Sequence, residues 1–230
     1  MKREVGVLLS QEVRDQIGMS AVIPAFPARL TGRFIQLEPV DIERDTLPLF
    51  QACNGTGPNG EPDAYDPDEL IWRYMFGGPY YSLDDFGQYM AGLTSMGEGL
   101  ALCVTDLASG RRIGVATYCN NAPAFLSIEL GGVWYGPAFQ RTYANTETVY
   151  LLLKHAFESL NYRRLEWKCD ALNSRSRQAG LKLGFVFEGI FRQHMIIKGR
   201  NRDTAWYSMI DSEWPSAREM LQSRLYGSRG

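Results

Sequence analysis

The pattern of apolar residues places a strand before a helix in the middle of the chain. Residues 127–135 are rich in residues that favour strands, but Gly131 and Gly132 interrupt them. Paired glycines in a strand pattern indicate a β-bulge, or a place where another backbone or a ligand comes close. From Val149 to Leu160, apolar residues recur at offsets of 3, 4, 7, 8 and 11. This spacing predicts one buried face of an α-helix.

The connection between this strand and this helix is a candidate binding site. Gly136 and Pro137 end the strand, and residues 140–145 carry no apolar period, so we predict a tight loop there. A loop that leads into a helix presents unpaired backbone N–H groups at the positive end of the helix dipole. Such an arrangement suits a phosphate group. An ordinary strand-to-helix connection would show the same pattern.

Apolar periods and turn residues assign the other elements. Strands are predicted at residues 30–37, 99–106, 111–119, 124–135, 163–170, 185–197 and 204–210. Helices are predicted at residues 41–53, 68–76, 82–96, 149–160, 173–183 and 215–225, with a break at Pro48. The order is a strand, helices, three strands, a helix, a strand, a helix and two strands. It predicts a fold of the α/β (α+β) class, in which a central sheet of mixed parallel and antiparallel strands carries helices on both faces.

Length and composition fit one globular domain with an extension. The chain has 230 residues, of which 45% are hydrophobic and 22% are charged. Residues 1–26 have weak periodicity, so we assign them to an N-terminal extension and residues 27–230 to a single domain. A formal charge of −2 predicts no nucleic-acid partner. No apolar run approaches the roughly 20 residues that cross a membrane, and the N-terminal apolar run is too short for a signal peptide.

The cysteine and histidine content argues against a metal site. The four cysteines are spread singly and only two histidines, His155 and His194, are present. No pair has the spacing of a zinc site, so we predict no metal. Free thiols in a reducing cytosol are the simplest interpretation, which predicts a cytoplasmic protein. We expect His155 to face solvent on its helix and His194 to be structural.

Three sequence segments resemble a known family. They are I-E-L-G-G-V-W-Y-G-P-x-x-Q-R-T-x-A-N-T-E from Ile128, N-S-R-S-R from Asn173, and K-L-G-F-x-x-E-G from Lys182. Together they resemble the GNAT acyltransferase superfamily, and within it the RimJ/RimL-type branch (ribosomal-protein N-terminal acetyltransferase-like), over roughly residues 27–215. The loop departs from the family pattern Q/R-x-x-G-x-G/A, because Tyr143 and Asn145 occupy the two small-residue positions.

The resemblance implies a GNAT fold and a site for acetyl-coenzyme A (acetyl-CoA). In that fold the fourth and fifth strands splay apart, and the pantetheine arm lies between them; here these strands are residues 124–135 and 163–170. The residues implied to bind acetyl-CoA are Val133, Trp134, Tyr135, Gln140, Arg141, Thr142, Tyr143, Ala144, Asn145, Asn173 and Ser176. Asn173 would also serve as a plain helix cap.

The resemblance also implies candidate catalytic residues. Glu129 stands where many family members place a general base, and burial in an apolar strand would make its carboxylate a stronger base. The alternative is a strand residue that faces solvent or pairs with an arginine. Ser176 matches the serine near the expected thiol. The tyrosine that many members use as general acid is replaced by Gly180, so Ser176, a water or no specific group protonates the leaving thiolate.

Two functions follow from the resemblance. The first is an N-acetyltransferase that moves the acetyl group of acetyl-CoA to a primary amine, on a protein N-terminus or a small molecule, by direct attack in a ternary complex. The alternative is an inactive GNAT-fold module that binds acyl-CoA or senses it, which Tyr143 and the missing tyrosine at Gly180 favour. The oligomeric state, monomer or homodimer, stays open. An unrelated nucleotide-binding protein is disfavoured because neither glycine-rich phosphate motif is present.

Overall fold

The computed structural model describes residues 9–17, 25–55, 65–95 and 99–227. Among these residues, eight strands form one open sheet in the order β1-β2-β3-β4-β5-β6-β8-β7. Neighbouring strands are antiparallel except β5 and β6, which are parallel. The strands are β1 (Leu30–Thr31), β2 (Ile35–Pro39), β3 (Leu100–Asp106), β4 (Arg112–Ala122), β5 (Ser127–Tyr135), β6 (Arg164–Asp170), β7 (Val186–Ile197) and β8 (Arg200–Ile210).

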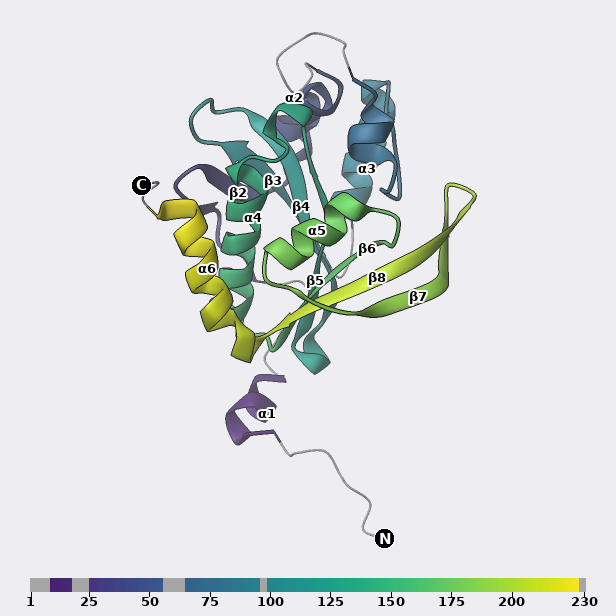
Figure 1. The fold of residues 1–230 in the computed structure, drawn as a ribbon. Coiled ribbons are helices and arrows are strands. Elements are labelled where there is room, and N and C mark those ends of the chain that lie inside the picture. Colours follow the sequence, from purple (N-terminus) through teal and green to yellow (C-terminus); the bar gives the residue numbers. More distant parts are fainter. Residues whose placement is uncertain (1–8, 18–24, 56–64, 96–98, 228–230) are drawn as a thin grey trace.

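Helices lie on both faces of this mixed sheet, as the sequence predicts (Figure 1). They are α1 (Gln11–Ile17), α2 (Ile42–Asn54), α3 (Leu83–Thr94), α4 (Tyr143–Lys154), α5 (Ser174–Lys182) and α6 (Trp214–Tyr226). Short turns complete the set: the π-helical turns η1 (Asp68–Trp72) and η4 (His155–Ser159), and the 3₁₀ turns η2 (Pro123–Phe125), η3 (Pro137–Phe139) and η5 (Asp211–Glu213). None of the described helices is both long and apolar enough to cross a membrane.

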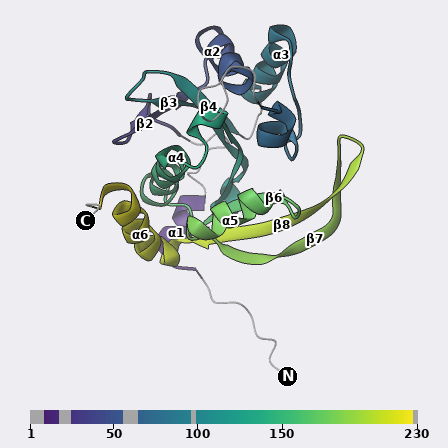
Figure 2. The ribbon, with the colours of Figure 1, turned by 45° about the horizontal axis from the view of Figure 1, so that its top comes forward.

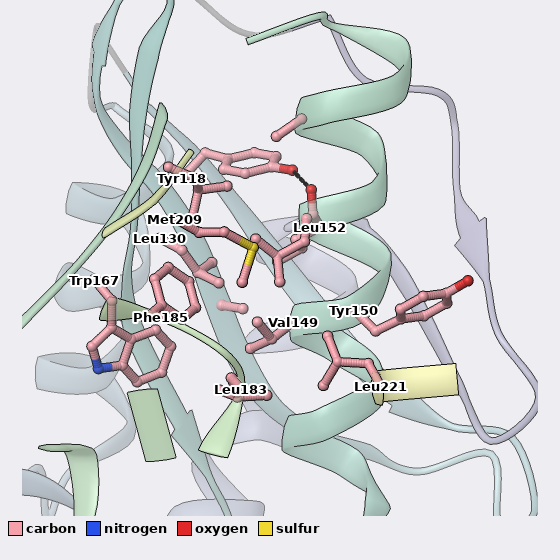
Figure 3. Packing of buried hydrophobic residues seen from close by; sticks show 14 of the residues in the cluster. Tyr118, Leu130, Val149, Tyr150, Leu152, Trp167, Leu183, Phe185, Met209 and Leu221 are labelled. Carbon is pink, nitrogen blue, oxygen red and sulfur yellow. Dashed lines mark hydrogen bonds between the residues drawn. The ribbon is translucent and has the colours of Figure 1, made fainter. Parts of the chain in front are cut away.

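The sheet separates two apolar clusters. Helices α4 and α6 lie side by side on one face, while α2 and α3 cover the other face (Figures 1 and 2). The first cluster joins α4 to the sheet, and Figure 3 shows Val149 and Leu152 of α4 opposite Leu130 and Met209. Tyr118 Oη donates to the carbonyl of Leu152 at 2.6 Å, which ties β4 to the same helix. The second cluster contains Leu49, Cys53, Trp72, Phe86, Met90, Cys103, Val115 and Trp134.

A buried carboxylate organises the start of the domain. Glu147 on α4 is completely buried and accepts hydrogen bonds from the backbone N–H groups of Arg33, Phe34 and Ile35 at 2.8, 2.7 and 2.7 Å. Tyr226 Oη donates to it as well, at 2.7 Å. These bonds hold the turn at residues 32–34, so residues 30–37 form a hairpin of two antiparallel strands, β1 and β2, instead of the single strand that the apolar pattern predicts.

Two helix predictions are wrong in detail. Helix α2 runs through Pro48 without the predicted break. A proline costs the helix one hydrogen bond and crowds the preceding turn, and burial of Asp45, Leu49 and Cys53 on one face offsets that cost. Residues 68–76 form only the turn η1, after which Gly77 and Gly78 redirect the chain. Just before this turn, Asp66 Oδ1 accepts from the Asp68 N–H at 2.8 Å.

His155 does not face solvent as predicted. It is 7% exposed at the end of α4, and its Nε2 lies 2.7 Å from the carbonyl oxygen of Ala25. The ring of Phe26 meets it edge-on at 5.2 Å. His155 therefore ties residues 25–26 to α4, while Gln16 Nε2 of α1 donates to the carbonyl of Leu160 at 2.8 Å.

We expect His155 to make stability depend on pH below neutrality. Burial lowers the pKa of His155, and the bond to Ala25 only partly opposes this shift. The unfolded chain therefore binds a proton at His155 more readily, so stability declines as pH falls below about 6.5. His155→Gln keeps a side-chain donor and removes the titration. Unfolding free energies measured from pH 8 to 5 should decline less steeply for this variant, and equal slopes would contradict the prediction.

Candidate active site

The site begins where β5 and β6 separate. Their parallel pairing comprises three residue pairs, of which the last joins Glu129 to Glu166. Beyond it β6 pairs only with β8, up to Asp170, and β5 pairs only with β4, up to Tyr135. A splay between these two strands is what the sequence resemblance implies. It leaves the backbone of residues 130–135 without a strand partner on the β6 side.

A bulge lies in β5 just beyond the point of separation, as the paired glycines predict. The register with β4 shifts between Thr117, which pairs with Gly131, and Val115, which pairs with Trp134. Gly132 has a φ angle of +58°, in the left-handed region that favours glycine. The bulge also reverses the alternation, because Leu130 and Tyr135 both belong to the cluster under α4.

Glu129 is the buried acid next to this bulge. It is 7% exposed, and Oε2 accepts from Lys168 Nζ at 2.9 Å and from Asn120 Nδ2 at 2.6 Å. Oε1 points toward the bulge, since it lies 3.3 Å from where a Cβ on Gly131 would be. Within the described residues, no donor contacts Oε1. Glu129 therefore neither faces solvent nor pairs with an arginine, and a lysine and an amide hold it in a charged environment.

The predicted loop at residues 140–145 ends earlier than expected, because α4 begins at Tyr143. Thr142 caps the helix, with Oγ1 accepting from the Ala144 N–H at 3.2 Å. Tyr143, Ala144 and Asn145 are therefore helical, which corrects the loop prediction for these three residues. Arg141 has a φ angle of +61° and is exposed, and Thr142 is exposed beside it. The exposed helix N-terminus and Arg141 together favour an anion.

Tyr143 does not crowd this helix terminus. Its ring stacks on Phe34 at 4.7 Å, and its hydroxyl donates to Asp106 Oδ1 at 2.5 Å. The hydrogen bond to Asp106, together with burial, raises the pKa of Tyr143 to about 12. The side chain thus packs toward β1–β3, although the family pattern has a small residue here.

The three predicted residues after the bulge are mainly core. Trp134 is 3% exposed and its Nε1 donates to Tyr89 Oη at 3.1 Å, while Tyr135 is 6% exposed and Val133 is half-buried. Their backbone lies along the open edge of β5. The carbonyl of Tyr135 accepts from the Gln140 side chain at 3.1 Å.

The two predicted residues Asn173 and Ser176 lie at the start of α5, which follows β6. Asn173 caps the helix, because its Oδ1 accepts from the Ser176 N–H at 3.0 Å. Ser176 Oγ accepts from Trp167 Nε1 at 3.1 Å, and Figure 3 shows Trp167 beside Phe185. A Cβ on Gly180 would lie 3.2 Å from the Trp167 ring, so Trp167 occupies the space that a tyrosine at this position would need.

Sequence reasoning missed a segment that bridges the two sides of the opening. Three backbone carbonyls of turn η1 accept hydrogen bonds from three distant parts of the chain. Gln140 Nε2 donates to Leu70 at 3.1 Å, Lys198 Nζ donates to Trp72 at 2.7 Å, and the Arg175 guanidinium donates to Glu69. These bonds place η1 across the gap between the end of β5 and the start of α5. Bonds between such distant segments leave no periodic signal in the sequence.

Sequence reasoning also missed Lys168 and Asn120, the two partners of Glu129. Both lie on strands, and the residue patterns around them only predict strands. Across the described ranges, no group of three or more His, Cys, Asp or Glu residues is arranged to hold a metal ion.

The chain resembles several known proteins. A GCN5-related N-acetyltransferase from Brucella melitensis is 36% identical, with a TM-score of 0.79, over 86% of this chain and 85% of that one. The uncharacterized N-acetyltransferase p20 of Bacillus licheniformis is 24% identical over 82% of this chain and 97% of its own length. YdaF of Bacillus subtilis (strain 168), provisionally named as a ribosomal N-acetyltransferase, is 29% identical over 83 residues.

The match to YdaF covers 36% of this chain and 45% of that protein, so the chain spans less than half of this relative.

A family model described as an acetyltransferase (GNAT) domain matches residues 61–186, which is more than half of the chain. That range contains the bulge, Glu129, the start of α4 and the whole of α5. The chain therefore belongs to the GNAT acetyltransferase family.

Proposed function

We propose that the protein transfers the acetyl group of acetyl-CoA to a primary amine, by direct attack in a ternary complex. The observation that carries this proposal is the position of Glu129. Its Oε1 accepts no hydrogen bond from the described residues, and it lies beside the bulge where β5 separates from β6. An attacking amine must lose a proton, and a carboxylate at this point is placed to accept it.

The residues along the opening suit the parts of acetyl-CoA. The thioester supplies the activated acetyl group. The open backbone edge at Val133, Trp134 and Tyr135 would hold the pantetheine amides by hydrogen bonds. Asn173 and Ser176 face this arm from α5. Arg141, with the N–H groups of the first turn of α4, would bind the pyrophosphate.

Protonation of the leaving thiolate needs no dedicated tyrosine. Gly180 replaces that tyrosine, and Ser176 Oγ, which accepts from Trp167, keeps its own proton to donate. We propose that Ser176 or a water supplies the proton. A thiol is an acidic leaving group, so the loss of the tyrosine is compatible with turnover.

The acceptor is a protein N-terminal amine or a small-molecule amine. The RimJ/RimL-type sequence and the similarity to YdaF favour the N-terminal amine. A screen of N-terminal peptides and small amines with labelled acetyl-CoA tests the proposal. Amine-dependent release of coenzyme A thiol supports it. Binding of coenzyme A without turnover for any amine would favour the alternative, an inactive acyl-CoA-binding or sensor module.

Acetyl-CoA should raise the melting temperature because it binds the folded chain. At 100 times Kd the gain is about 2.7 kcal/mol, which corresponds to a rise of about 5–10 °C. Arg141→Glu and Asn145→Asp place negative charge beside the proposed pyrophosphate and should reduce the rise. Thermal scans with and without the ligand measure it.

The matched control for this experiment is Lys154→Glu, a charge reversal at the exposed other end of α4. It should leave the rise in melting temperature unchanged. If Arg141→Glu and Asn145→Asp behave like this control, the pyrophosphate lies elsewhere.

The remaining parts of the proposal concern organisation. We propose that residues 27–230 form the catalytic domain and that residues 1–26 are an extension. The four cysteines form no disulfide, which supports a cytoplasmic location.

A homodimer stays a prediction. Strand β7 is one edge of the sheet and exposes apolar side chains such as Phe191 and Ile196, and a measurement of molecular mass in solution decides the state.

A further inference from the structure

Glu129 is one end of a chain of charged side chains that continues along β6. Lys168 Nζ lies 2.9 Å from Glu129 Oε2 and 2.7 Å from Glu166 Oε2. Glu166 Oε1 in turn accepts from Arg164 Nε at 2.9 Å. The β6 residues of this chain alternate with buried Leu165, Trp167 and Cys169, so their side chains leave the sheet on the opposite face from α4.

Lys168 is held as an ammonium ion between two carboxylates. Burial alone would lower the pKa of Lys168, but Glu129 and Glu166 outweigh it and the net pKa is raised. The Nζ atom also lies 3.9 Å from the centroid of the Trp206 ring, a position that favours a cation. Its side chain is only 12% exposed, so solvent screens these interactions weakly.

The two oxygens of Glu129 have different surroundings. Oε2 accepts from both Lys168 and Asn120, whereas Oε1 points toward Gly131 and has no donor in the described part of the chain. Fixing one oxygen fixes the direction of the other. A carboxylate whose Oε2 was released could rotate, and Oε1 would then lose its place beside the bulge.

We propose that Lys168 is a positioning residue that pairs with the Glu129 carboxylate and keeps it aimed at the bulge, and that Glu166 limits this hold by competing for the same ammonium. The proposal rests on the proposed function, in which Glu129 accepts the proton of the amine. Because these two charges lie next to the Glu129 carboxylate, removing either of them should change its affinity for a proton.

The other charged or titratable groups near Glu129 do not replace this pair. Cys119 faces it from β4, and burial raises the pKa of its thiol, so the thiol stays neutral. Glu188 of β7 is bonded to Arg164 at 2.8 and 2.6 Å, one step further along the chain. The charges next to Glu129 within the described residues are therefore those of Lys168 and Glu166.

Two variants should move the same titration in opposite directions. Lys168→Met removes the positive charge and keeps the apolar stem, so the acidic limb of the pH–rate profile should move to higher pH by roughly one to three units. Glu166→Gln removes the competing negative charge, so the limb should move to lower pH. General loss of stability cannot produce shifts of opposite sign. Lys154→Met, the same substitution at an exposed position, should leave the limb in place.

A second measurement does not depend on activity. The ¹³C signal of the Glu129 carboxyl group, identified by its loss in Glu129→Gln, can be titrated in the full-length protein without ligand. Its midpoint should rise in Lys168→Met and fall in Glu166→Gln. Because Glu166→Gln leaves Lys168 paired with Glu129, this variant tests the idea even if Lys168→Met does not fold.

The outcomes separate the two proposals. Midpoints that stay at the wild-type value in both variants overturn the role of Lys168, whatever the activity. Amine-dependent turnover whose acidic limb disappears in Glu129→Gln but stays fixed in Lys168→Met and Glu166→Gln overturns it too, and leaves the proposed function intact. Absence of turnover with every amine overturns the proposed function alone, because the carboxyl titration still reports on Lys168.

Discussion

Replacing Glu129 by glutamine should lower kcat by about 100-fold or more, which is the lower end of the contribution of a positioned general base. Glutamine keeps the shape of the side chain and can still accept from Asn120, but it cannot take up a proton. The acidic limb of the pH–rate profile should therefore flatten. Binding of acetyl-CoA should barely change, because the proposed pyrophosphate site at Arg141 lies beyond the far end of β5. Steady-state kinetics from pH 5 to 9 measure these effects.

Glu219→Gln is the matched control, since Glu219 is an exposed acid on α6, remote from β5. It should leave kcat and the pH profile as they are. If Glu129→Gln retains near-normal kcat and the wild-type acidic limb, Glu129 is not the base. A water chain or another residue would then take the proton.

Replacing Glu147 by alanine should cost roughly 3–5 kcal/mol of stability, because one buried and several partly buried donors lose their acceptor at once and each unsatisfied buried group costs about 1–3 kcal/mol. The carboxylate holds the N–H groups of Arg33, Phe34 and Ile35 and the hydroxyl of Tyr226. The connection between β1 and β2 would lose its anchor on α4. Denaturant unfolding should show this loss, and the melting temperature should fall by about 6–20 °C.

Tyr226→Phe is the matched control for Glu147, because it removes only the hydroxyl that donates to the carboxylate. It should cost about 1 kcal/mol, the typical value of one hydrogen bond. The buried side chain also explains Gly32, where a Cβ would lie 2.5 Å from the Glu147 carboxyl carbon. A stability of Glu147→Ala within 1 kcal/mol of wild type would contradict this account.

Local patterns predicted most of the architecture. The apolar period from Val149 identified α4, and the alternation in residues 163–170 identified β6, whose Leu165, Trp167 and Cys169 are all buried. Asn173 and Gly184 bound α5 as cap and terminator, with Gly184 at a φ angle of +96°. These signals depend on neighbours within one or two turns or pleats, so they can be read from the sequence alone.

Three differences from the sequence-based expectations involve a distant partner. Pro48 would end an isolated helix, but α2 continues because it packs on the sheet. His155 was expected at the surface, but it is buried, where its ring bonds to the carbonyl of Ala25, 130 residues away in the chain. Tyr143 stands where the family pattern has a small residue, but its ring stacks on Phe34 and its hydroxyl bonds to Asp106, so it points away from the helix terminus. Single-sequence patterns carry no information about such contacts.

The candidate site divides in the same way. The paired glycines predicted a bulge beside Glu129, and the apolar period predicted a helix after it; the structure has both. The surroundings of the carboxylate were not predictable. Lys168 and Asn120 come from β6 and β4, and they meet Glu129 only because the sheet places these strands on either side of β5.

By itself, the sequence determined which segments become strands and helices, where β5 bulges and which acid stands beside the bulge. It did so because backbone propensity and the period of apolar residues act over a few residues. Tertiary structure alone decided at which residue the pairing of β5 and β6 ends, that η1 bridges the opening, and that Lys168 lies between two carboxylates. These features depend on strand order and on charges brought together across the sheet, and both arise only when the whole chain packs.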